Sequence, residues 1–316
     1  MLMALGMPVI ALLVVAGVLL DLMLGEARRW HPLVGFGNLA NALERWLNKP
    51  DRSILCGALA WLLAVLPPVI AAIWLIRIAA STSFWLVALL HVLLLYFSIG
   101  LRSLRDHLLP IATALAAQDL PLARALTARI VSRDTADASA SDLAKAGVES
   151  LLENGNDAVF GTLFWFVIAG GPGALLFRLA NTLDAMWGYR TPRYLRFGRV
   201  AARIDDGLNW VPARLTALSY ALLGNTANAL WCWRTQAPAW SSPNAGPVMS
   251  AGAGALGLAL GGAARYDGEI ESRPALGRGE PAAGRDIARA WHLVLGTCAL
   301  WTGVIGLIGF LLWLKG

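Results

Sequence analysis

Long apolar runs dominate the chain and predict membrane helices. A bilayer core needs about 20 apolar residues per crossing helix. Six runs meet this requirement, at 3–24, 54–76, 83–101, 212–233, 247–264 and 293–314. A further apolar run, 158–177, is interrupted by the sequence Gly170-Gly171-Pro172-Gly173. We therefore predict an all-α polytopic integral membrane protein, with about six transmembrane helices and one broken or re-entrant helical segment.

Polar stretches between these runs indicate how the chain is oriented. Stretches 25–53, 102–157, 178–210 and 265–292 contain five, six, six and five Lys or Arg residues. Basic loops collect on the cytoplasmic side. If 158–177 crossed once, the six arginines of 178–210 would lie outside. If it dips in and returns at the glycine-rich break, all four stretches lie inside, so we predict a re-entrant hairpin lining a site.

Composition agrees with one membrane domain over residues 1–316. The chain is 57% hydrophobic and only 15% charged, whereas soluble proteins carry about 25% charged residues. The net charge of +6 is explained by basic cytoplasmic loops, so we expect no nucleic-acid partner. The first run has no basic n-region or obvious cleavage site, which favours a retained helix over a signal peptide. Cys56, Cys232 and Cys298 lie in apolar runs and are expected to be free thiols.

An acidic ladder precedes the broken segment. Glu149, Glu153 and Asp157 are spaced four apart, so on a helix they share one stripe. Ser139 or Ser141 is placed to cap that helix, near Asp142. A solvated helix face is the plain alternative, but charges at a bilayer are expensive and usually functional. A cation or a cationic substrate group would relieve the repulsion.

A second polar group follows the broken segment. Asn181 and Asp184 are three residues apart, and Asp205, Asp206 and Asn209 come about 20 residues later. Such hard oxygen donors suit Mg²⁺, and we expect Pro212 to open the next membrane helix. The intervening arginines are natural phosphate ligands, namely Arg190, Arg193, Arg196, Arg199 and Arg203. The plain alternative is that these arginines serve orientation and pair with the acids.

Two smaller features complete the candidate site. Asn244 lies in a Ser-Pro-Asn turn, on a connection that this topology places outside, so a substrate-binding role would need a break in 212–264. His31 is the histidine that stands out, because Arg28, Arg29 and loop glycines surround it. The chain contains no Walker phosphate loop, G-x-S-x-G elbow or H-E-x-x-H pair.

In this order, these motifs resemble the adenosylcobinamide-phosphate synthase family of cobalamin biosynthesis, also called the CbiB or CobD family. The resemblance covers nearly the whole chain and is most specific in NTLDAMWGYRTPRYLRFGRVAARIDDGLNWVPARLTA. Supporting motifs are LDLMLGEARRWHPLVGFG, SRDT, VESLLENGNDAVFGTLFW, SPNAG, AGALG and RPALGRG. The chain departs from the family pattern at Glu26, Ser132, Thr162 and Pro247, and the last departure puts the local geometry near 246 in doubt.

The resemblance implies a multi-pass inner-membrane ligase with its active site facing the cytoplasm. It would join adenosylcobyric acid to aminopropanol or its O-phosphate, using ATP and Mg²⁺. Its partners would be that corrinoid, the amine, the lipid bilayer and other late enzymes of the pathway.

Chemistry, rather than the resemblance, suggests a role for each residue. We expect Mg²⁺ to be held by Asp184, Asp205, Asp206, Asn181 and Asn209. Glu149, Glu153 and Asp157 are expected to hold the amine or a second cation, with one acting as base. Substrate contacts are expected from Arg133, Asp134, Asn154, Arg190, Arg203, His31 and Asn244.

Two other functions fit parts of the sequence. A Mg²⁺-dependent intramembrane prenyltransferase would also use Asn- and Asp-rich loops, but the spacing from Asn181 to Asp184 is one residue short of its usual N-x-x-x-D motif. A non-enzymatic membrane sensor of the ampicillin-resistance regulator type is the other alternative. The intact set of acids and arginines argues against it.

Overall fold

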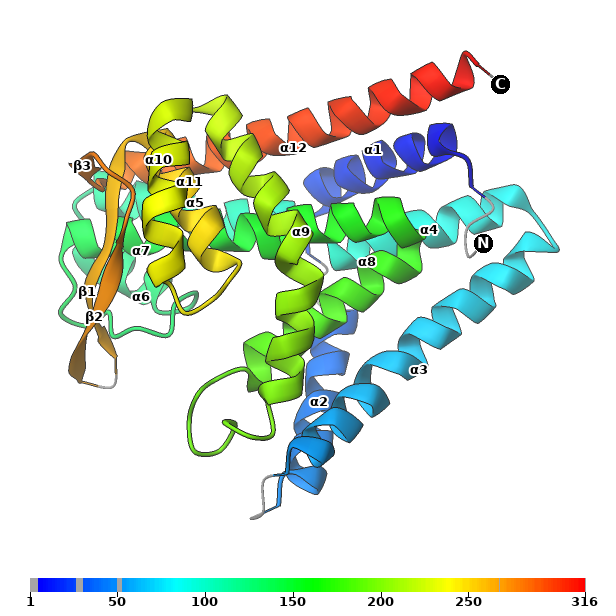
Figure 1. Ribbon diagram of the computed structural model, residues 1–316, viewed down its shortest axis with the longest axis horizontal. Coiled ribbons are helices and arrows are strands. Elements are labelled where there is room, and N and C mark those ends of the chain that lie inside the picture. The colour runs from blue at the N-terminus through cyan, green and yellow to red at the C-terminus, as the bar shows by residue number, and fades with distance from the viewer. Residues whose placement is uncertain (1–4, 27–30, 50–52, 267, 316) are drawn as a thin grey trace. The chain divides into compact units, whose positions relative to one another are not determined.

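The computed structural model describes residues 5–26, 31–49, 53–266 and 268–315. The chain is mostly helical, as predicted, and also contains a small sheet that the sequence pattern did not predict (Figure 1). In chain order the elements are α1 (Met7–Leu24), α2 (Pro32–Leu47), α3 (Ile54–Ala80), α4 (Phe84–Ser98), α5 (Leu101–Ala116), α6 (Leu120–Thr127), α7 (Ala140–Gly155), η1 (Asn156–Phe160), α8 (Gly161–Trp187), α9 (Arg199–Leu223), α10 (Thr226–Gln236), η2 (Ala237–Ala239), α11 (Ala245–Leu256), β1 (Leu258–Tyr266), β2 (Glu269–Leu276), β3 (Glu280–Pro281) and α12 (Gly284–Trp313).

The chain forms two compact units that are interleaved in sequence, where the sequence pattern predicted one membrane domain. The first unit comprises residues 1–100, 157–209 and 302–316, and the second comprises 101–156 and 210–301.

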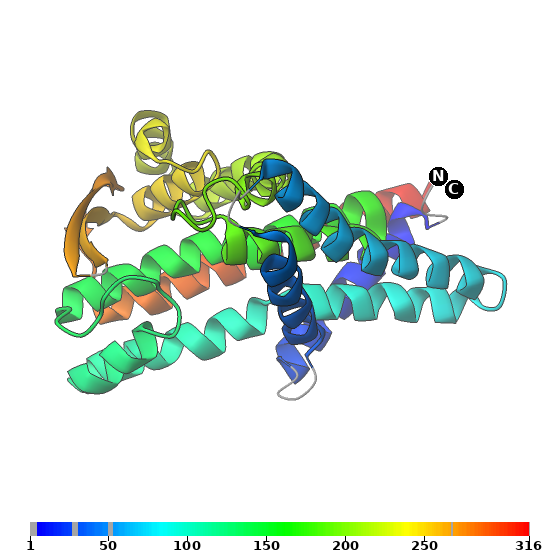
Figure 2. The same ribbon diagram turned by 90° about the horizontal axis from the view of Figure 1, so that it is seen from below.

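Five helical stretches of the described chain are long and apolar enough to cross a membrane, by length and composition. They lie at Met7–Leu24, Ile54–Ala80, Phe84–Ala116, Ala140–Trp187 and Gly284–Trp313. The predicted run 54–76 falls within one of them, runs 83–101 and 293–314 do so except for one end residue each, and run 3–24 does so from Met7 onward. In the first unit, α3 and α4 form a long hairpin (Figures 1 and 2).

Helix α8 reverses direction within its apolar part. Ala169 (φ −136°, ψ 18°) and Gly170 (φ 60°, ψ −155°) leave the helical region, and glycine adopts the positive φ without strain. In an unbroken helix Gly161 and Phe177 would lie about 24 Å apart, yet a Cβ on Gly161 would overlap the Phe177 ring. The two arms therefore lie side by side, and the predicted break and return are confirmed.

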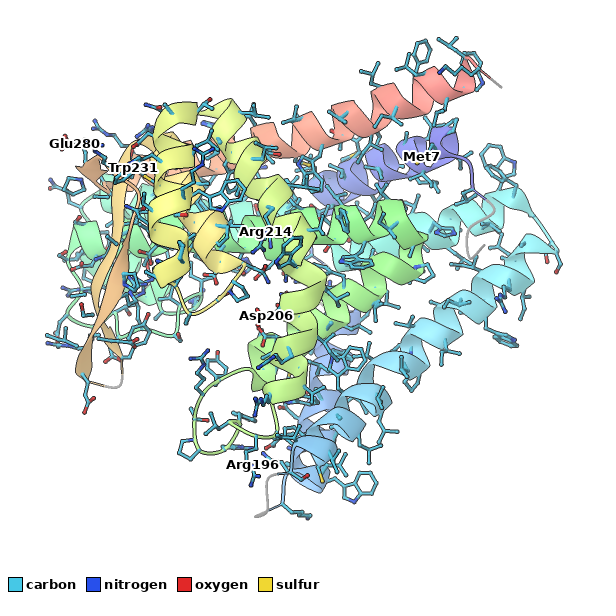
Figure 3. All side chains as sticks on the ribbon, viewed as in Figure 1. Met7, Arg196, Asp206, Arg214, Trp231 and Glu280 are labelled. Atoms are coloured by element: carbon cyan, nitrogen blue, oxygen red, sulfur yellow. The ribbon has the colours of Figure 1, made fainter. Side chains whose placement is uncertain are left out.

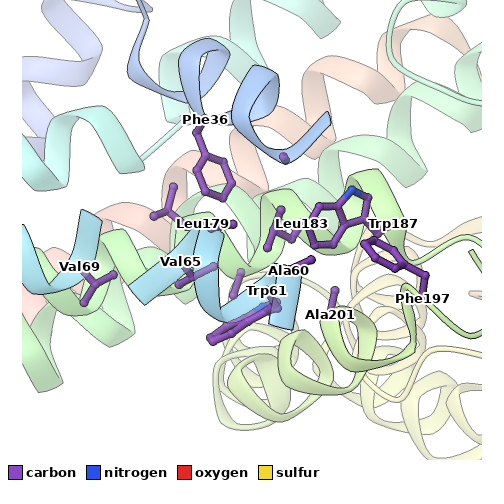
Figure 4. Packing of buried hydrophobic residues seen from close by; sticks show 13 residues of the cluster. Phe36, Ala60, Trp61, Val65, Val69, Leu179, Leu183, Trp187, Phe197 and Ala201 are labelled. Atoms are coloured by element: carbon purple, nitrogen blue, oxygen red, sulfur yellow. The ribbon is translucent and has the colours of Figure 1, made fainter. Parts of the chain in front are cut away.

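The core of the first unit fixes the segment that follows α8. Phe197 is fully buried, and the centroid of its ring lies 5.1 Å from that of the Trp187 ring. The cluster in Figure 4 also includes Trp61 of α3 and Leu183 of α8. A Cβ on Gly57 would overlap the Phe197 carbonyl oxygen, so only glycine allows α3 to approach this closely. The segment 188–198 is thus tied to α3 and α8 by apolar packing.

The second unit holds the three-stranded sheet, in the order β2-β1-β3. Strand β1 pairs antiparallel with β2 and parallel with β3. The predicted membrane span 247–264 is therefore wrong. Helix α11 has only 12 residues, because Gly257 (φ 67°, ψ 39°) ends it in the left-handed conformation. Hydropathy did not reveal this, since the strand that follows is also apolar.

The predicted span 212–233 is also wrong. Helix α9 ends at Leu223, and α10 begins at Thr226 after Asn225, whose side chain caps it. Pro212 lies inside α9 rather than at its start. Other local predictions are confirmed. Ser139 caps α7 in a capping box with Asp142, and the three cysteines are free.

We predict that Gly161→Leu prevents the arms of α8 from closing. The added side chain has no space beside Phe177, so the loss of stability should exceed the roughly 1–3 kcal/mol of ordinary overpacking. Gly303→Leu is the matched control, because a Cβ there meets nothing within 4 Å. Size-exclusion chromatography after heating the solubilised variants would compare them. A melting midpoint equal to that of the control would contradict the side-by-side arrangement.

Candidate functional site

The hairpin of α8 and the first turns of α9 bring together the second polar group of the sequence. Asn181 and Asp184 lie on the returning arm of α8, and Asp205, Asp206 and Asn209 lie on α9. All five belong to the first unit. We call these residues, together with Asp157 of η1, the acidic cluster. The structure thus unites residues that the sequence separates by up to 52 positions.

Asp205 is at the centre of the acidic cluster. Its side chain is buried, with a relative exposure of 7%. The Asn209 amide donates to both of its oxygens, at 3.2 and 3.1 Å, and the Asn181 amide donates to Oδ1 at 3.3 Å. Burial raises the pKa of Asp205 well above its ordinary value, and the charges of Asp157 and Asp184 raise it further, whereas the two amides lower it. Asp205 is therefore a carboxylate that resists ionisation.

Next to the acidic cluster lies a cavity of about 600 Å³. We call it the arginine pocket, because four arginines line it, together with Asp206, Tyr189 and Tyr194. The four are Arg190, Arg196, Arg199 and Arg203. Figure 3 marks Asp206 on α9 and Arg196 on the preceding segment. Burial raises the pKa of Asp206, while Arg203 and Arg190 lower it. One pocket wall thus combines a carboxylate with several guanidinium groups, a group type that suits phosphate.

Two charged groups that the sequence analysis did not select lie near Asp157. The charges of Glu26 and Asp157 both act on the guanidinium of Arg178, which lies on the returning arm of α8. His31 is close as well: burial lowers its pKa, Glu26 raises it and Arg178 lowers it. His31 Nδ1 caps α2 by accepting from Leu33 N at 3.2 Å, so its role is at least partly structural. In the sequence, Arg178 could be linked to the acidic cluster only by its three-residue spacing from Asn181.

The acidic ladder is not a single functional stripe. Glu149 is buried at 3% exposure in the second unit. Its carboxylate binds Arg133 at 2.6 Å and Arg273 at 2.9 Å, and it accepts from Gly261 N at 2.8 Å. A carboxylate engaged by two guanidinium groups and an amide is a poor base, so these contacts favour a structural role for Glu149, and its catalytic role stays a prediction. The three ladder residues also belong to different units. Glu149 and Glu153 lie in the second unit, where Glu153 is half-buried, and Asp157 lies in the first.

Other predicted substrate ligands also lie in the second unit and have structural partners. Asp134 accepts from Gly268 N at 2.7 Å, and Arg133 and Asp134 border a second cavity of about 730 Å³. The Asn154 amide donates to Ser150 O at 2.9 Å. Asn244 Oδ1 accepts from Arg214 Nη1 at 2.7 Å.

Comparison with known proteins decides the family. A sequence profile described as "CobD/Cbib protein" matches residues 14–294. The chain belongs to the CobD/CbiB family. It is 55% identical over 302 residues to the cobalamin biosynthesis protein CobD of Stutzerimonas stutzeri, covering 94% of this chain and 97% of the relative. The CobD proteins of Chromobacterium violaceum and Rhodobacter capsulatus are 52% and 37% identical, over 93% and 95% of this chain and 95% and 98% of their own lengths. No solved structure matches the chain.

The acidic cluster of this CobD/CbiB protein suits Mg²⁺ by the chemistry of its donors. Within the described ranges, no three His, Cys, Asp or Glu side chains are arranged as a metal-binding set. However, Asn181 and Asn209 direct their amide groups at the buried Asp205 carboxylate. A half-turn of either amide would present an oxygen in place of the nitrogen. The residues are therefore compatible with a hard cation, which would also relieve the repulsion among the carboxylates.

We predict that Asp205→Asn stabilises the protein at neutral pH in the presence of EDTA. Because the folded-state pKa is raised, the stability that Asp205 contributes is fully present below its ordinary value of 3.8. This stability is lost as the pH rises through the folded-state value. At pH 7.5 the wild-type protein must either bury an ionised Asp205 or keep its carboxyl protonated, and both cost stability that a neutral amide does not. Each ~1 kcal/mol gained should raise the melting midpoint by about 2 °C at this chain length.

The gain from Asp205→Asn should shrink as the pH falls towards 4. Thermal unfolding of the solubilised protein across this range is the measurement. Asp106→Asn is the control, because that carboxylate is 48% exposed and belongs to a surface pair with Arg102. A midpoint below wild type at pH 7.5 would show that the ionised Asp205 stabilises the fold instead.

Proposed function

We propose that the chain is an adenosylcobinamide-phosphate synthase, an ATP-dependent ligase of cobalamin biosynthesis. It would join the carboxyl group of adenosylcobyric acid to the amine of aminopropanol O-phosphate or of aminopropanol. Membership of the CobD/CbiB family supports the pathway. The observation that carries the chemistry is the arginine pocket, whose wall includes Asp206 and which lies beside the buried Asp205.

The proposed reaction has two balanced steps. A carboxylate oxygen of the corrinoid acid attacks the γ-phosphorus of ATP, the bond to ADP breaks and an acyl phosphate forms. The amine nitrogen then attacks the acyl carbon and loses a proton to a base, and inorganic phosphate leaves as the amide forms. Such a sequence needs cations around the transferring phosphoryl group and a carboxylate near the amine.

The arginine pocket would meet the first need. Arg190 and Arg203 lie close enough to Asp206 to lower its pKa, so phosphate oxygens bound there would lie near the carboxylates of the cluster. Asp184, Asp205 and Asp206 would hold Mg²⁺, helped by Asn181 and Asn209. Bound Mg²⁺ would neutralise developing charge on the phosphates. The arginines would orient those phosphates and exclude water from between them.

Asp157 would meet the second need. Its charge acts on both Asp205 and Arg178, which places it at the cluster rather than in the second unit with Glu149. We propose that Asp157 attracts the ammonium form of the amine, which loses one proton to water before it attacks, and that Asp157 accepts the second proton, which is lost on attack. The protein would lie in the inner membrane, and its basic stretches would face the cytoplasm, where ATP is available.

We predict that the gene rescues a strain lacking its own synthase when cobyric acid is supplied. The empty strain should grow on cobinamide but not on cobyric acid, because only the amide-forming step is missing. A prenyltransferase or a sensor would not restore growth on cobyric acid. Absence of rescue by a chain that is present in the membrane fraction would contradict the ligase assignment.

Single substitutions in the same strain would test the site. Asp205→Ala and Asp206→Ala should abolish cobinamide formation, and Arg190→Ala and Arg203→Ala should lower kcat/KM by about 10²-fold through lost phosphate contacts. Arg77→Ala and Asp106→Ala are the matched controls, since both residues are exposed and neither lines the arginine pocket. Full activity in both aspartate variants would reject the metal assignment.

A further inference from the structure

Helix α2 carries a buried carboxylate that the proposed reaction does not use. Glu44 is 4% exposed. Arg193 donates two parallel hydrogen bonds to the Glu44 carboxylate, from Nε to Oε1 at 3.0 Å and from Nη2 to Oε2 at 2.7 Å. Asn48 Nδ2 donates to Glu44 Oε1 at 2.7 Å and to the carbonyl oxygen of Arg193 at 3.1 Å. We call Glu44, Asn48 and Arg193 the α2 clasp.

The clasp holds the segment that forms most of the arginine pocket. Residues 188–198 contain turns but no regular helix between α8 and α9. Seven of the pocket's twelve lining residues lie on this segment. At its end the segment is fixed in the core by Phe197. The clasp provides a second anchor four residues earlier, and it binds main chain as well as side chain.

Arg193 differs from its neighbours in where its charge is used. Five arginines lie between positions 190 and 203, and four of them line the pocket. Arg193 is not among the lining residues, and its guanidinium is bound to Glu44. The guanidinium of Arg193 lowers the pKa of Glu44, and the Asn48 amide lowers it further, against the effect of burial. The clasp is therefore ionised at neutral pH.

Geometry makes this ion pair more specific than an ordinary surface pair. Surface salt bridges usually contribute little unless the contact is bidentate and well ordered. Here the arginine contact is bidentate and the carboxylate is buried with a third donor, which fixes the direction of the arginine side chain. Removing Glu44 would leave the turn contacts of residues 188–196, the packing of Tyr194 against the core and the bond from Asn48 to the Arg193 carbonyl oxygen, but would remove the ion pair that directs the Arg193 side chain.

We propose that Glu44 and Asn48 are positioning residues, which fix the arginine pocket through Arg193 for binding the phosphates of a nucleotide. The identity of that ligand rests on the proposed ligase function, whereas the mechanical role of the clasp does not. Neither residue touches substrate in this account. Their effect passes through the segment 188–198 to Arg190 and Arg196.

Steady-state kinetics with MgATP would test the positioning role. Glu44→Gln and Arg193→Ala should each raise the KM for ATP by about tenfold, with kcat within about twofold of wild type, because nucleotide binding is lost rather than chemistry. The double variant should be no worse than either single variant, since both break one contact. Arg102→Ala is the control, because it breaks a surface ion pair with Asp106.

Hydrogen exchange would test the mechanical role without any catalysis. Both clasp variants should accelerate amide exchange over residues 188–196, and leave α3 and α8 at wild-type protection. Unchanged exchange there, together with an unchanged KM for ATP, would overturn the proposal. If Glu44→Gln exposes α3 as well, Asn48→Ala becomes the deciding variant, because it keeps the ion pair and removes the Asn48 bonds to the Glu44 carboxylate and to the Arg193 carbonyl oxygen. Wild-type exchange over 188–196 in that variant would also overturn it.

A wild-type protein without ligase activity would refute the proposed function and not the clasp. In that case accelerated exchange over 188–196 in the variants would still support the clasp. An active ligase whose variants show normal exchange and a normal KM would refute the clasp and leave the proposed function intact.

Discussion

Reversal of α8 within an apolar segment is the constraint on which the site depends. A helix that stops there leaves backbone groups without partners, and in an apolar setting each of them is costly. One of these groups is satisfied by His91, whose Nδ1 accepts from Gly171 N at 2.9 Å. The close contact of Gly161 with Phe177 then holds the arms together. Because of this reversal, the polar half of α8 returns to meet the start of α9.

Electrostatic repulsion is the second constraint, and it links structure to chemistry. The acidic cluster places Asp157, Asp184 and Asp205 within range of one another's charge, and burial makes each charge more expensive. The fold reduces this repulsion in two ways. Amides donate to Asp205, and arginines act on Asp206 and Asp157. The remaining negative charge would favour an incoming cation, as the proposed reaction on phosphates requires.

Sequence patterns revealed the parts of this arrangement that local rules govern. The glycine-rich break, the Ser139 cap and the order of acids and amides were all readable, because each depends on neighbours along the chain. Hydropathy failed at 247–264, where a short helix and a strand are equally apolar. The pairing of Glu149 with Arg273 could not be foreseen, since 124 positions separate them. Glu44 likewise gave no signal, because its partner Arg193 lies 149 positions away.

In the proposed function, the arginine pocket and the acidic cluster together form the nucleotide site. The most direct measurement is an electron cryomicroscopy structure of the protein in lipid nanodiscs with Mg²⁺ and a non-hydrolysable ATP analogue. Our account predicts phosphate density against Arg190 and Arg203, with a metal beside Asp205 and Asp206. A nucleotide bound instead in the cavity of the second unit, against Lys145 and Arg265, would contradict it.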